Sequence, residues 1–85
     1  MRQLRTLDAF DSNLDQNAIS ELRNLTKLIL SNCLKITNLN HLTQLRELDV
    51  SFDCGVDENG ISMLHNLVKL DARHNKRIIT NSFGI

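Results

Sequence analysis

Two stretches of the sequence, LTKLILSNC at residues 25–33 and LRELDVSFDC at residues 45–54, share one spacing of apolar residues. In each, two leucines stand three residues apart and the next apolar residue follows two positions later. A spacing of three suits a helix and a spacing of two suits a strand, so neither regular structure accounts for the whole stretch. Because the combination occurs twice, it indicates an internal repeat.

Four segments with this spacing superimpose without a gap. The second apolar position recurs at intervals of 21, 20 and 22 residues, and each segment continues with a polar turn and two further apolar residues. The six apolar columns are Met1, Leu22, Leu42 and Leu64; Leu4, Leu25, Leu45 and Leu67; Leu7, Leu28, Leu48 and Leu70; Ala9, Leu30, Val50 and Ala72; Leu14, Ile36, Val56 and Ile78; and Ile19, Leu39, Ile61 and Phe83. We therefore predict one domain over residues 1–85, with units at about 1–21, 22–41, 42–63 and 64–85.

These columns resemble the pattern of the leucine-rich repeat family, L-x-x-L-x-L-x-x-N/C-x-L. The pattern is matched by L25-x-x-L28-x-L30-x-x-C33 and by L67-x-x-L70-x-A72-x-x-N75. The cadence is similar to that of internalin-like repeats, and LSNCLKITN at residues 30–38 resembles the cysteine-containing class. The resemblance implies an α/β fold: a four-repeat solenoid with a parallel β-sheet on its concave side and short helices and turns on its convex side. Such solenoids normally have capping units at their ends, and none is evident in this sequence.

The turn after each expected strand carries a small polar residue. In the family, the side chain at this ninth position satisfies backbone groups of the turn. The residues at this position are Ser12, Cys33, Asp53 and Asn75. Cys54 replaces Asp53 in this alignment if the third turn contains an inserted residue, and the sequence leaves both registers open.

The connections between the expected strands alternate in character, giving a longer period of about 42 residues. Asp15 and Asp57 stand where an N-cap would open a short helix in the first and third units. Gly60 weakens the second of these helices by up to ~1 kcal/mol relative to Ala18 in the first. The connections of the second and fourth units are shorter and predict turns or 3₁₀ structure.

Composition excludes several function classes. Ten Lys and Arg residues offset ten Asp and Glu residues, so we expect no attraction to nucleic acid or to an anionic membrane. No apolar run is long enough to cross a bilayer, and residues 1–20 lack the features of a secretory signal. The two cysteines, Cys33 and Cys54, favour free thiols and a cytoplasmic location, although adjacent turns also lie within reach of a disulfide.

We expect no enzyme activity, metal or cofactor. The three histidines fall at different positions of their units, and the cysteines lack the spacing of a zinc site. Cys33 and His74 are separated by two repeat steps, roughly 10 Å at strand spacing, which is too far for a nucleophile and its base.

The solvent-facing positions of the strands and turns are the candidate binding surface, because the resemblance places binding on the concave side. Asp residues form a column that Ile29 interrupts, and Phe10 and Phe52 add exposed aromatic groups. The candidate residues are Asp8, Phe10, Asp11, Ile29, Asn32, Asp49, Phe52, Asp71, Arg73 and His74.

Two functions follow as expectations. The first is a non-enzymatic leucine-rich repeat module that binds another protein, either by itself or as a fragment of a longer array. The alternative is a natural or engineered building block that stacks head to tail into homo-oligomers, because the last residues align to where the first unit begins. The end-stacking residues would be Met1, Leu4, Leu7, Leu70, Ile78, Phe83 and Ile85.

Overall fold

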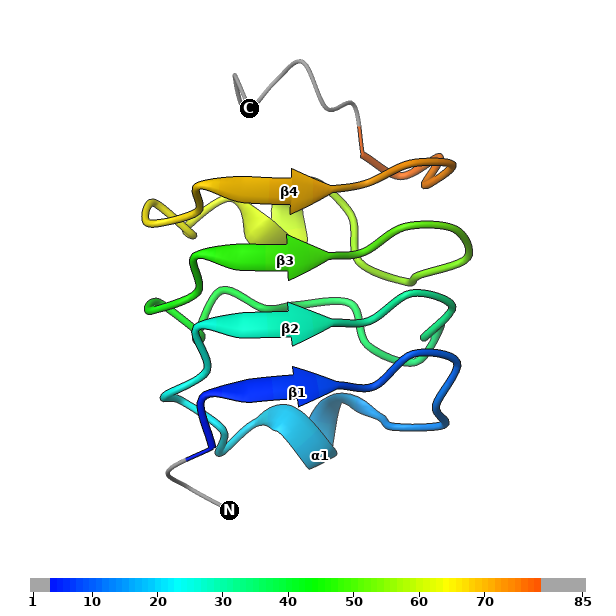
Figure 1. Cartoon of the computed structure of the whole chain (residues 1–85). Coiled ribbons are helices and arrows are strands. Elements are labelled where there is room, and N and C mark those ends of the chain that lie inside the picture. Colours follow the sequence, from blue (N-terminus) through cyan, green and yellow to red (C-terminus); the bar gives the residue numbers. More distant parts are fainter. Residues whose placement is uncertain (1–3, 79–85) are drawn as a thin grey trace.

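A computed structural model describes residues 4–78, which contain a four-stranded parallel β-sheet (Figure 1). The strands are β1 (Thr6–Asp8), β2 (Lys27–Ile29), β3 (Glu47–Asp49) and β4 (Lys69–Asp71). They lie in the sheet in chain order, and the segment after each of β1, β2 and β3 returns behind the sheet to begin the next strand. The parallel sheet and its few helices are compatible with the predicted α/β class.

The central leucine of each strand defines the register of the sheet. Leu7 pairs with Leu28, Leu28 with Leu48, and Leu48 with Leu70, as the repeat alignment predicts. The backbone repeats the same contact at each step: the Arg5 carbonyl accepts hydrogen bonds from the N–H groups of Thr26 and Lys27. The residues that the repeat interval aligns are therefore the same residues that pair in the sheet.

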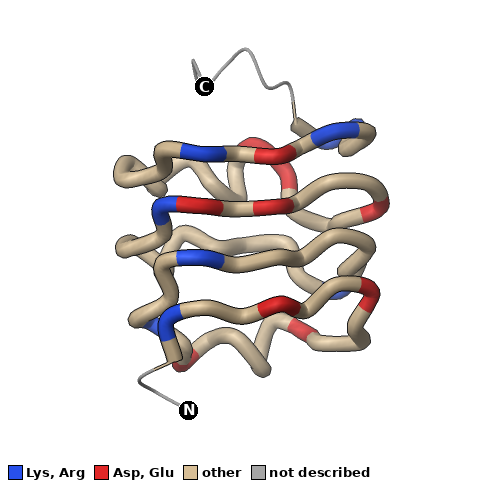
Figure 2. The backbone as a smooth tube through the Cα atoms, viewed as in Figure 1, with Lys and Arg blue, Asp and Glu red and all other residues tan. Residues whose placement is uncertain are grey.

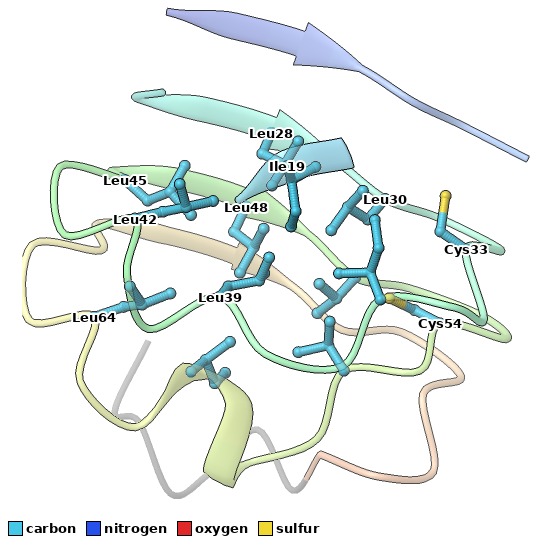
Figure 3. Close-up of a cluster of buried hydrophobic side chains, with 14 of the residues drawn as sticks. Ile19, Leu28, Leu30, Cys33, Leu39, Leu42, Leu45, Leu48, Cys54 and Leu64 are labelled. Atoms are coloured by element: carbon cyan, nitrogen blue, oxygen red, sulfur yellow. The ribbon is translucent and has the colours of Figure 1, made fainter. Parts of the chain in front are cut away.

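The predicted apolar columns fill the interior on one side of the sheet (Figure 3). The side chains with no measurable exposure include Ile19, Leu25, Leu28, Leu30, Ile36, Leu39, Leu42, Leu45, Val50 and Val56. The corresponding side chains of the outer units are only partly buried, and they are Leu4, Leu7, Leu14, Leu67 and Leu70. No single unit encloses its own leucines, so the stacking of units creates the core. Truncating one of the central leucines to alanine typically costs about 2–5 kcal/mol.

The first connection contains the helix α1 (Gln16–Ile19). The Asp15 carboxylate accepts a hydrogen bond of 3.0 Å from the N–H of Ala18, which confirms Asp15 as the N-cap. The helix buries Ile19 against the core. The capping residue and one apolar side chain therefore account for this short helix.

The third connection differs from the prediction of a second α-helix. It contains a 3₁₀ turn, η1 (Asn59–Ile61), although the Asp57 carboxylate does accept a hydrogen bond of 2.8 Å from the N–H of Gly60. A Cβ atom at Gly60 would overlap the carbonyl oxygen of Thr37 in the preceding connection. Gly60 is thus required by the close approach of two backbones, and its carbonyl oxygen accepts a hydrogen bond of 2.8 Å from the N–H of Leu39.

Two side-chain amides join neighbouring connections. Gln16 donates to the carbonyl oxygen of Asn38 at 2.6 Å and accepts from the N–H groups of Thr37 and Asn38. One unit further on, Asn40 donates to the Asn59 carbonyl and accepts from the Met63 N–H, each at 2.9 Å. These bonds satisfy backbone groups that have no strand partner, so the side opposite the sheet stays ordered without long helices.

Candidate functional site

Alternate strand side chains point away from the core and form a surface that we call the open face. Its members are Thr6, Lys27, Glu47 and Lys69 in one row and Asp8, Ile29, Asp49 and Asp71 in the other. All eight are exposed or partly exposed. Figure 2 shows both basic and acidic residues on these strands. The predicted candidates Asp8, Ile29, Asp49 and Asp71 therefore share one row of this face.

The two rows of the open face differ in how their charges are compensated. Lys27 and Lys69 lie directly beside Glu47, so opposite charges alternate in the first row. In the second row, Asp49 and Asp71 are direct neighbours. Like charges at adjacent positions of a sheet destabilise it, so this row is not arranged for stability alone.

Arg73 relieves part of that repulsion. Its guanidinium donates two hydrogen bonds to the Asp71 carboxylate, from Nε at 3.1 Å and from Nη2 at 3.0 Å. These bonds are the main reason that the pKa of Asp71 lies below its ordinary value. The side chain of Arg73 is 76% exposed, so the pair adds little to folding stability.

The open face contains two shallow hollows. One lies over β2, β3 and β4, and the other lies over β1 and β2. Both hollows are lined by Lys27 and Ile29. Ile29 is therefore an apolar residue that lines both hollows.

The turn after each strand contains one residue in the left-handed backbone region. These residues are Asp11, Asn32, Phe52 and His74, with φ angles from 53° to 64°. Asp and Asn tolerate this conformation because their short side chains form local hydrogen bonds, whereas a bulky aromatic residue there is strained. Phe52 is nevertheless 47% exposed, and its ring stacks on that of His74 with centroids 5.2 Å apart.

The two candidate phenylalanines occupy different places. Phe52 occupies the left-handed position of the third unit, whereas Phe10 precedes that position in the first unit, as Arg73 does in the fourth. Two repeat steps separate Phe10 from Phe52, roughly 10 Å at strand spacing. Both rings are exposed, so they form two separate apolar spots in the turns that follow the strands.

The structure decides between the two registers that the sequence left open for the ninth position of the third unit. Asp53 is exposed, whereas Cys54 is fully buried, as Cys33 is in the second unit. Asp53 is therefore the inserted residue, because it separates the left-handed Phe52 from the buried Cys54, whereas the left-handed Asn32 of the second unit directly precedes Cys33. Local sequence alone cannot detect such an insertion, since Asp and Cys both fit a turn.

The ninth-position side chains bind the turns together as expected. The Cys33 thiol donates to the Ala9 carbonyl oxygen at 2.9 Å, and the Asn75 amide donates to the Val50 carbonyl oxygen at 2.7 Å. Cys33 and Cys54 are both free thiols and both buried. Burial raises the pKa of the Cys54 thiol to about 11, which makes it a poor nucleophile.

Three exposed apolar residues were missed by the sequence reasoning. They are Leu34, Met63 and Val68, each more than half exposed. Met63 and Val68 each stand next to a residue of a core column, whereas Leu34 stands next to the ninth-position Cys33. The signal that was available is that each is apolar yet belongs to none of the six columns.

The predicted end-stacking residues divide into three groups. Leu4, Leu7 and Leu70 are partly buried, whereas Ile78 is buried with 6% exposure. Met1, Phe83 and Ile85 lie outside the described residues.

Residues 4–78 contain no cluster of metal-binding side chains. No group of three or more His, Cys, Asp or Glu side chains there is close enough to hold a metal ion. His41 contacts the carbonyl oxygen of Ile19 at 3.0 Å, His74 stacks on Phe52, and His65 is exposed. None of the helices in this range is long and apolar enough to cross a membrane.

Comparison with known proteins gives no relative to draw on. The sequence matches no protein-family model and none of the curated proteins. The open face and the turns that border it are therefore the features from which a function can be inferred.

Proposed function

We propose that this chain is a leucine-rich repeat solenoid whose open face binds another protein. Support for the solenoid comes from the near-constant unit interval and from four parallel strands in chain order with their leucines in register. Support for binding comes from a sheet face with mixed charge, bordered at its carboxyl end by exposed aromatic residues.

The observation that carries the binding proposal is the backbone of Phe52. A non-glycine residue in the left-handed region costs about 1–2 kcal/mol, and the equivalent positions of the first two units hold Asp11 and Asn32, which suffer less. Folding gains little from an aromatic ring that is 47% exposed. A strained, exposed phenylalanine stacked on His74 is instead suited to act as a rigid contact for a partner.

The proposal is tested by affinity capture on the immobilised chain, with each retained protein then assayed singly. We compare the wild type with Phe52→Asn, which suits the left-handed backbone, and with Met63→Ser, which removes an exposed apolar residue elsewhere. A protein that binds the wild type and Met63→Ser equally but binds Phe52→Asn at least fivefold more weakly supports the proposal. Equal binding to all three chains, or no retained protein, refutes it.

A second proposal is self-association through the edge strands. It is favoured by the partial exposure of Leu7 on β1 and Leu70 on β4, each at an outer strand of the described sheet. The test is light scattering behind a sizing column over a hundredfold range of concentration. A mass that rises in multiples of 9.7 kDa, and falls back with Leu70→Glu, supports stacking, whereas a constant 9.7 kDa refutes it.

A further inference from the structure

Ile29 occupies a distinctive place on the open face. Its strand neighbours in the same row are Asp8 on β1 and Asp49 on β3. Ile29 lines both shallow hollows of this face and is partly exposed. A ligand group over Ile29 therefore contacts an apolar side chain with a carboxylate on each side.

Both carboxylates are held in position by the turns that follow them. Oδ1 of Asp8 accepts the N–H of Phe10 at 3.1 Å. Oδ1 of Asp49 accepts the N–H of Ser51 at 2.9 Å and its hydroxyl at 2.6 Å. Among residues 4–78, the hydrogen bonds of these two carboxylates all use Oδ1, so Oδ2 of each remains for a ligand.

The nearby cations lie beside other acidic residues. Lys27 belongs to the first row, where its strand neighbour is the oppositely charged Glu47. Arg73 is attracted by Asp49, but its hydrogen bonds go to Asp71. The space over Ile29 therefore favours a cation with an apolar stem, and it disfavours an anion or an uncharged apolar group.

We infer that the protein segment bound on the open face presents an arginine or lysine over Ile29. Its methylene stem packs on the isoleucine, and its charged head lies between the carboxylates of Asp8 and Asp49. The strands that carry these two residues are about 10 Å apart, a span that a basic head group and its two carboxylate partners fill together. This inference rests on the proposed protein-binding function and specifies the chemistry of the partner.

The test is a phage-display selection of random heptapeptides on the immobilised full chain, followed by affinity measurements on the enriched peptides. The binding variant is Asp8→Asn with Asp49→Asn, because asparagine keeps the Oδ1 acceptor that the turns use. The matched control is Glu21→Gln with Asp53→Asn, which makes the same change in net charge at exposed positions off the open face. Circular dichroism verifies that both variants fold.

The expected result is enrichment of peptides that share one arginine or lysine. Their affinity falls roughly tenfold in the open-face variant and less than twofold in the control, as the loss of two exposed charge pairs implies. Replacing the shared basic residue of the peptide by norleucine gives a similar loss on the wild type and none on the open-face variant.

Two results would overturn the inference, and they differ in what they say of the proposed function. Enriched peptides that lack a basic residue but lose affinity with Phe52→Asn refute the inference and leave protein binding intact. A selection that enriches nothing, or only peptides indifferent to both Phe52→Asn and the open-face variant, refutes the proposed function and the inference together.

Discussion

Gly60→Ala tests whether backbone contact or helix propensity governs the third connection. Propensity alone predicts a gain of up to ~1 kcal/mol, because alanine is the better helix former. The structure predicts the opposite sign, because the added Cβ would overlap the carbonyl oxygen of Thr37. Relieving that overlap requires a backbone shift, and overpacking of this kind costs about 1–3 kcal/mol.

The shift also disturbs a second interaction. The N–H of Leu39 donates to the carbonyl oxygen of Gly60 at 2.8 Å, and a backbone hydrogen bond contributes about 0.5–1.5 kcal/mol. After subtraction of the propensity gain, we expect Gly60→Ala to lower the free energy of unfolding by about 2 kcal/mol. With a urea m-value of about 1 kcal/mol/M for a chain of this size, the unfolding midpoint falls by roughly 2 M.

The assay is urea unfolding followed by far-ultraviolet circular dichroism, since the chain has no Trp or Tyr. Ala18→Gly in α1 is the control, because Ala18 is exposed and its loss of ~1 kcal/mol reflects propensity alone. If Gly60→Ala unfolds at the same urea concentration as the wild type or at a higher one, the close approach to Thr37 does not limit this position and the argument fails.

Three further predictions concern the turns and the open face. Asn75→Ala leaves two buried carbonyl oxygens without their donor and is expected to lower the free energy of unfolding by about 2 kcal/mol, measured by urea unfolding, with exposed Asn13→Ala as the control. The raised pKa of the Cys54 thiol stabilises the fold at pH values below 9.0, the ordinary pKa of the group, and this stabilisation is lost as the pH rises from 9 to about 11. In urea unfolding, Cys54→Ala should therefore lose less stability than the wild type over that pH range. The lowered pKa of Asp71 depends on Arg73, so Arg73→Met should raise that pKa toward its ordinary value in an NMR titration, while the free energy of unfolding changes little because the pair is exposed.

Each of these predictions has an outcome that contradicts it. For Asn75, the contradiction is an alanine variant as stable as the Asn13 control. For Cys54, it is a pair of stability profiles that stay parallel between pH 9 and pH 11. For Asp71, it is a carboxyl pKa that stays low without Arg73, or a pKa that rises together with a large loss of stability. The lowered pKa of folded Asp71 stabilises the fold at pH values above the ordinary pKa of the group, and this stabilisation is lost as the pH falls.

The sequence predicted the core better than the turns, for a physical reason. Burial follows apolar periodicity, and the repeated spacing assigned Leu28, Leu48 and Ile36 to the interior, where the structure places them. The insertion of Asp53 was not decidable, because the residue types allowed in a turn are interchangeable and only the stacking on the preceding unit selects which one is buried. The repeat alignment of a strand is set by several leucines, whereas that of a turn depends on one side chain.

The candidate site was predicted in part. The alignment assigned Asp8, Ile29 and Asp49 to one row, and the strand register confirms that row. It could not indicate the strained backbone of Phe52, since no residue-level pattern reports a φ angle. Nor could it show that Gly60 is required by contact with another connection, because that contact joins segments 23 residues apart.

The departures from local rules gather in the third unit. This unit contains the left-handed phenylalanine at position 52, the inserted Asp53, and Gly60, which admits the backbone of the preceding connection. Consistency between local preference and fold is what makes a sequence fold well, and violations that persist are expected where function compensates for their cost. The 3₁₀ turn and Gly60 are explained by packing alone, whereas the ring of Phe52 is 47% exposed and stacks on His74, which is itself exposed. We therefore attribute the backbone strain at Phe52 to function. Phe52 follows β3, the strand that contributes Asp49 to the row with Ile29.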